Sequence, residues 1–111
     1  MMINMGKIRA VHVVYADWCP HCVPTTVEPV KRKAEQIGVP CFLYNIDDAA
    51  ALKKADDLVK KYGDDGEDYL IPQVFLEYED NQINHVFTGY SEDIDLTRSA
   101  LMTLLNSHLL N

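Results

Sequence analysis

The chain has 111 residues, 48% of them hydrophobic, and a formal net charge of −7 at pH 7, which argues against nucleic acid and anionic membrane surfaces as partners. This length fits a single domain over residues 1–111 with one core. No apolar run could span a membrane, no signal-peptide pattern opens the chain, and the cysteine count is odd, so we expect a cytoplasmic protein without a disulfide scaffold.

Residues 7–15 form the first predicted strand, because its second half is rich in β-branched valine. Asp17 and Pro20 then signal a turn, and Pro20 suits the first position of a helix over residues 20–36. Cys19 should therefore lie just before a helix N-terminus, where unpaired N–H groups and the helix dipole favour a thiolate.

The rest of the chain alternates apolar segments with turn signals. Gly38 should end the first helix, Asp48 can cap the next one, and Ser91 can cap the last, with Asp93 in its first turn. Further elements are expected as strands at 41–46, 71–78 and 83–87, a helix at 49–62, and a hairpin turn at 79–82. The order β-α-β-α-β-β-α predicts an α/β fold: a four-stranded mixed sheet, its first two strands parallel, with helices on both faces.

Cys19 and Cys22 have the Cys-x-x-Cys spacing of a redox pair, because the second thiol lies one turn on and can attack a mixed disulfide at the first. Cys41 is isolated and is interpreted as a small buried hydrophobe. His12 is interpreted as structural, since no second metal ligand is spaced to join it. We predict no resident metal site.

Two stretches resemble the thioredoxin-like superfamily. Residues 18–22, Trp-Cys-Pro-His-Cys, look like its active-site motif, and residues 70–75, Leu-Ile-Pro-Gln-Val-Phe, look like the segment that those proteins place opposite the cysteines. Pro72 would then follow a cis peptide bond. The resemblance covers nearly the whole chain and implies the minimal thioredoxin fold, as in glutaredoxins.

The resemblance also implies roles. Cys19 is the exposed nucleophile and Cys22 the resolving cysteine, while Pro20 and His21 tune the thiolate. A hydrogen bond or positive charge from His21 would stabilise the reduced state and make the disulfide more oxidising. Trp18 would offer a flat apolar contact to a protein substrate, with plain packing as the alternative.

Residues of the second half are implied in substrate binding. The proline at Pro72 exposes the backbone of Ile71, which can pair with an extended substrate. Gly89 and Tyr90 loosely resemble the glutaredoxin turn that helps to bind glutathione, and a simple strand-to-helix turn explains the same residues.

Two positions depart from the family. Val13 stands where thioredoxins carry a buried acid, and Pro24 lies unusually close to the cysteines. Because proline lacks an N–H and crowds the preceding turn, Pro24 should loosen the first turns of the helix.

The leading hypothesis is a thiol–disulfide oxidoreductase, a glutaredoxin/thioredoxin-like electron carrier that reduces protein disulfides through a Cys19–Cys22 dithiol/disulfide cycle. It needs no bound cofactor, and a reductase or glutathione would return it to the dithiol. The alternative is a metal carrier that binds copper(I), or a subunit-bridging iron–sulfur cluster, through Cys19 and Cys22. A third hypothesis is an interaction module with vestigial cysteines.

Overall fold

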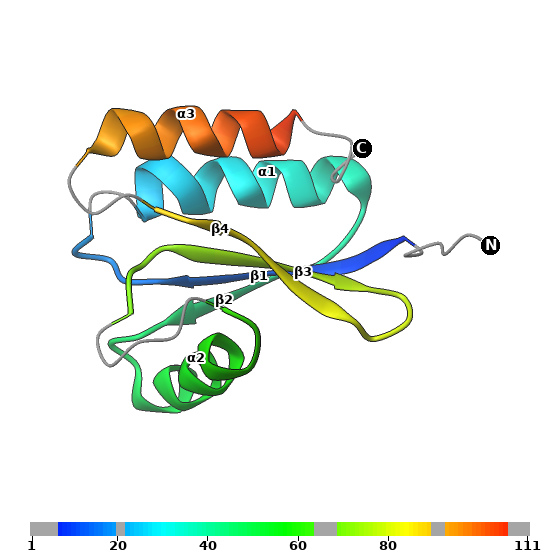
Figure 1. The fold of residues 1–111 in the computed structure, drawn as a ribbon, viewed down its shortest axis with the longest axis horizontal. Helices are drawn as coiled ribbons and strands as arrows, with labels where there is room; N and C mark the ends of the chain where they lie inside the picture. The colour runs from blue at the N-terminus through cyan, green and yellow to red at the C-terminus, as the bar shows by residue number, and fades with distance from the viewer. Residues whose placement is uncertain (1–6, 20–21, 64–68, 90–92, 107–111) are drawn as a thin grey trace.

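The computed structural model describes residues 7–19, 22–63, 69–89 and 93–106, and it has the predicted order of elements (Figure 1). All four strands and all three helices expected from the sequence are present within these residues. They are β1 (Ile8–Tyr15), η1 (Val23–Val27), α1 (Glu28–Ile37), β2 (Cys41–Asn45), α2 (Ala49–Tyr62), β3 (Gln73–Tyr78), β4 (Ile83–Thr88) and α3 (Ile94–Leu105).

The four strands form one mixed sheet in the order β2-β1-β3-β4. β1 pairs with β2 in parallel, as the sequence predicted, and with β3 antiparallel, while β3 and β4 form an antiparallel hairpin. Val13 of β1 therefore has Leu43 on one side and Val74 on the other. β1 is an inner strand, so its backbone and both of its faces are covered.

Helices lie on both faces of this sheet, which confirms that part of the expectation. α1 and α3 run side by side over one face, and α2 lies on the other (Figure 1). Successive side chains of β1 point to opposite faces of the sheet. Val11 and Val13 are buried in the cluster under α1 and α3, whereas Val14 packs with Phe75 and α2.

The first helix differs from the predicted helix over residues 20–36. Residues 20 and 21 lie outside the described residues, and Val23–Val27 forms a π-helical turn before the α-helix proper begins at Glu28. The Thr26 and Val27 N–H groups both donate to the Cys22 carbonyl, at 2.9 and 2.7 Å. Pro24 and Pro29 lack N–H groups and crowd the preceding turn, so the wider turn relieves that crowding. The expectation that Pro24 loosens these first turns is confirmed.

The other helix ends follow their cap residues. Gly38 ends α1 in the left-handed conformation, with φ of 77°, and Asp48 caps α2 by accepting from the Ala51 N–H. α3 begins at Ile94 with Asp93 as its cap, so the placement of Asp93 inside the first turn was wrong. Ser91, the expected cap, lies outside the described residues.

β3 starts two residues later than predicted. The Ile71–Pro72 peptide bond is cis, as the family resemblance implied, and Gln73 is the first residue of the strand. Proline has no N–H to give to a strand ladder, which explains why pairing begins only after Pro72.

Candidate functional site

The two motif cysteines lie directly beyond the C-terminal end of β1. The chain turns there through two backbone hydrogen bonds, from the Cys19 N–H to the Ala16 carbonyl at 3.2 Å and from the Cys22 N–H to the Cys19 carbonyl at 3.0 Å. Ala16, Cys19 and Cys22 form one buried group, which we call the cysteine cluster, and Ile71 packs against it. The spacing of two residues thus brings both thiols to one place.

The placement of the two cysteines corrects two expectations. Cys22, rather than Cys19, is the cap residue of the first helical turn, which begins at Val23. Cys19 is also not the open thiol that the family resemblance implied, since only 6% of its surface is exposed, against 0% for Cys22. The cause is the tight turn between Ala16 and Cys22, which folds Cys19 back onto the end of β1.

The thiol of Cys22 is held in its protonated form. Burial raises its pKa far above the ordinary range, and a side-chain hydrogen bond with Cys19 raises it further, whereas a backbone hydrogen bond with Ala16 acts in the opposite direction. The Cys22 thiol is therefore not a nucleophile while it keeps this proton.

Trp18 lies on the surface next to the cysteine cluster. Its side chain is 65% exposed, and its indole N–H donates to Asp47 Oδ1 at 3.2 Å. The Asn45 side chain donates to Asp17 Oδ2 at 3.1 Å and fixes the same turn to the end of β2. The indole ring is thereby oriented while most of its surface stays open to a partner, so packing inside the fold does not account for Trp18.

Pro72 is fully buried, follows Ile71, which packs against the cysteine cluster, and contacts Gly89. The Gly89 N–H donates to the Pro72 carbonyl at 2.9 Å. A Cβ on Gly89 would lie 2.7 Å from Pro72 Cδ, closer than such atoms approach, so only glycine fits here. The structure thus brings Ile71, Pro72 and Gly89 together and gives Gly89 a packing role.

Three predicted site residues, Pro20, His21 and Tyr90, lie outside the described residues. Within the described part of the chain, no three His, Cys, Asp or Glu side chains gather as metal ligands could. No helix among the described residues is long and apolar enough to cross a membrane.

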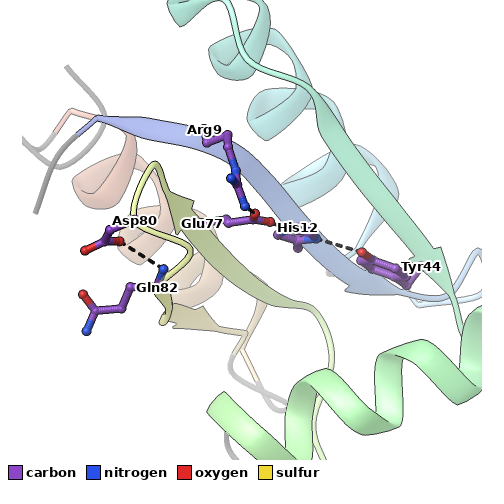
Figure 2. A network of polar contacts seen from close by, with 6 residues as sticks. All are labelled: Arg9, His12, Tyr44, Glu77, Asp80 and Gln82. Carbon is purple, nitrogen blue, oxygen red and sulfur yellow. Dashed lines mark hydrogen bonds and ion pairs between the residues drawn. The ribbon is translucent and has the colours of Figure 1, made fainter.

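A second polar site, which contains His12, was not predicted from the sequence. The His12 ring lies 2.7 Å (Nε2) from Glu77 Oε1 and 2.8 Å (Nδ1) from the Tyr44 hydroxyl, and Arg9 pairs with the other oxygen of Glu77 (Figure 2). The structural interpretation of His12 fits these contacts. Two-residue alternation would place Arg9 on the face of Val11, opposite His12, and the pairing with β3 has a register shift between Ile8 and Ala10. The contact of Arg9 with Glu77 could therefore not be found from the sequence pattern.

A scan against protein-family models finds no match for this chain, and searches of curated proteins and of solved structures find none either.

Proposed function

We propose that this protein is a thiol–disulfide oxidoreductase of the thioredoxin-like superfamily, with the minimal thioredoxin fold, which reduces protein disulfides in the cytoplasm. The observation that carries the proposal is the pair of thiols, Cys19 and Cys22, that one turn brings together in a buried cluster at the end of β1. The element order and the mixed sheet support the fold assignment, and the contact of Ile71 with the cysteine cluster supports a substrate site beside it.

The proposed cycle moves two electrons in two exchange steps. The Cys19 thiolate attacks one sulfur of a substrate disulfide, so that bond breaks and the substrate's second sulfur leaves as a thiolate. Cys22 then loses its proton and attacks the Cys19 sulfur of the mixed disulfide, so that bond breaks and the other substrate sulfur leaves as a thiolate. One substrate thiolate takes up the proton of Cys22 and the other takes a proton from water. The substrate ends as a dithiol and the protein as a Cys19–Cys22 disulfide, which a reductase or glutathione returns to the dithiol.

Trp18 and the backbone of Ile71 would receive the substrate. The indole, directly before Cys19 in the chain, offers exposed apolar surface, and Ile71 packs against the cysteine cluster. In this scheme His21 and Pro20 tune the Cys19 thiolate, and Gly89 with Tyr90 would contact glutathione where it is the reductant.

The test uses the reduction of a disulfide-bonded protein by three variants. Cys19→Ser should abolish turnover, whereas Cys22→Ser should accumulate a mixed disulfide that is visible by mass spectrometry. Cys41→Ser is the matched control, because burial raises the pKa of the Cys41 thiol to about 11 and keeps it inert, so this variant should stay fully active. Full activity of the Cys19→Ser variant would refute the mechanism.

The reduction potential of the Cys19–Cys22 pair would establish the direction of electron flow. A value between about −270 and −200 mV fits a reductant of cytoplasmic proteins, as proposed. A value near about −120 mV would mean that His21 dominates the chemistry and that the protein donates disulfides instead.

A further inference from the structure

An open pocket of about 760 Å³ lies on the α2 side of the sheet, beside the start of that helix. The residues that matter for its chemistry come from four elements: Arg9 and His12 of β1, Phe42 and Tyr44 of β2, Glu77 of β3 and Lys54 of α2. We call this the aromatic pocket. None of these residues belongs to the cysteine cluster, and the volume lies within the usual range for small-molecule sites, about 300–1,000 Å³.

Three nearly parallel rings form one wall of the aromatic pocket. The His12 ring lies 5.2 Å from the Phe42 ring and 5.8 Å from the Tyr44 ring, with interplanar angles of 23° and 14°. His12 and Tyr44 are largely covered, but Phe42 is 46% exposed. A large aromatic side chain that is half open and borders a pocket offers a surface on which another flat ring can stack.

The hydrogen-bond chain in Figure 2 holds this wall in place. Arg9 and His12 lower the pKa of Glu77 through hydrogen bonds, so Glu77 is ionised and accepts from His12 Nε2–H. Burial raises the pKa of Tyr44, which keeps its proton at 2.8 Å from His12 Nδ1. Both ring nitrogens of His12 therefore have partners, and the ring is fixed in orientation rather than left to bind a metal.

Lys54 is the basic residue of the aromatic pocket that is available to a negatively charged group. Glu77 is already paired with Arg9 and His12, and Asp48, the other acid of the lining, accepts from the Ala51 N–H at the helix start. Among the residues that the structure describes, no carboxylate pairs with Lys54, which lies exposed one turn into α2. The lining carries two basic and two acidic side chains and so has no net charge, and Lys54 is the basic one that no carboxylate of the described residues pairs with.

We propose that the aromatic pocket binds a small molecule that combines a planar aromatic ring with one negatively charged group. The ring stacks against Phe42, and the charge lies against the ammonium group of Lys54. Aromatic carboxylates and mononucleotides both have this chemistry, and the experiment distinguishes them. The proposal does not depend on the redox cycle, since the pocket shares no residue with the cysteine cluster.

The test titrates the full chain with 1-naphthoate and adenosine monophosphate, and with their uncharged counterparts 1-naphthamide and adenosine. Binding is followed by the amide signals in two-dimensional NMR. We expect at least one charged ligand to bind with a Kd below about 1 mM, and its neutral counterpart to bind at least about tenfold more weakly. Shifts confined to β1, β2 and the start of α2 place the ligand. The ligand that binds more tightly identifies the class.

Two pairs of variants keep the test specific. Phe42→Leu removes the ring but keeps an apolar side chain, and Lys54→Glu reverses the charge; each should weaken binding at least about fivefold. Leu96→Ala and Lys60→Glu change an exposed apolar and an exposed basic residue elsewhere, and should leave the Kd within about twofold. Equal binding of charged and neutral ligands, equal effects of the control variants, or no shifts with any ligand at about 5 mM would overturn the proposal.

Discussion

The cysteine cluster and the aromatic pocket share one sheet and one central strand, but the chain assembles them differently. The cluster comes from a single turn between Ala16 and Cys22, so the spacing of these residues along the sequence is enough to predict it. The pocket needs Arg9, Tyr44 and Glu77 from three strands, and only the register of the sheet brings them together. A local motif depends on one turn, whereas a site built across strands depends on the whole sheet.

The substitution with the largest expected effect, at Phe75, should destabilise both the cysteine cluster and the aromatic pocket. Phe75 is fully buried beneath α2 in the strand that pairs with β1. Phe75→Ala should lower the free energy of unfolding by about 3–5 kcal/mol, because it leaves a cavity between sheet and helix. Denaturant unfolding measures this loss. Leu96→Ala, an exposed control, should change it by less than about 0.5 kcal/mol. A Phe75→Ala loss as small as the control's would contradict the packing described here.

A change at Gly89 should disturb the cysteine cluster alone. The added methyl group of Gly89→Ala meets Pro72, so we expect a stability loss of about 1–3 kcal/mol and slower reduction of a protein disulfide. Gly38→Ala is the matched control: it has open space but a left-handed backbone, which costs about 1–2 kcal/mol without touching the cluster. Equal reduction rates in the two variants, once both are folded, would show that Pro72 does not need its present position.

A change at Glu77 should disturb the aromatic pocket alone. Glu77→Gln removes the charge that pairs with Arg9 and His12, and should cost about 1–2 kcal/mol at neutral pH. The folded state lowers the pKa of Glu77 below its ordinary value of 4.5, so its contribution is complete above that value and disappears as the pH falls through the lowered pKa. Unfolding curves of both proteins between neutral and acidic pH should therefore converge in acid. If the two proteins differ in free energy of unfolding by the same amount at every pH, the ionised pair is contradicted. At each pH, Glu77→Gln should reduce protein disulfides at the same rate as the unchanged protein.

The smallest effect on stability is expected at Trp18. Because this side chain is mostly exposed, Trp18→Ala should change the free energy of unfolding by no more than about 0.5 kcal/mol. It should nevertheless slow the reduction of a disulfide-bonded protein while leaving that of a small aliphatic disulfide unchanged. Equal slowing of both reactions would mean that Trp18 acts on the thiols rather than on the substrate.

Much of the fold could be predicted from the sequence, because apolar periodicity and cap residues act locally. The bounds of α2 agree with the prediction, and Gly38 and Asp48 end and start helices as expected. The π-helical turn could not be placed in advance, since it depends on how Pro24 and Pro29 share one turn. The limited exposure of Cys19 was missed because it results from the turn that folds Cys19 onto β1.

β1 sets a strict limit on how the chain can vary in length. Its alternation directs Val11 and Val13 to one layer and His12 and Val14 to the other, while neighbours on both sides hold its register. One residue inserted before His12 would move His12 and Val14 to the layer beneath α1 and Val13 to the other layer, placing an imidazole among aliphatic side chains. Two inserted residues would restore the faces, although every pairing beyond them would shift. Homologues that keep both sites should therefore vary in length in the connections between elements and not within this strand.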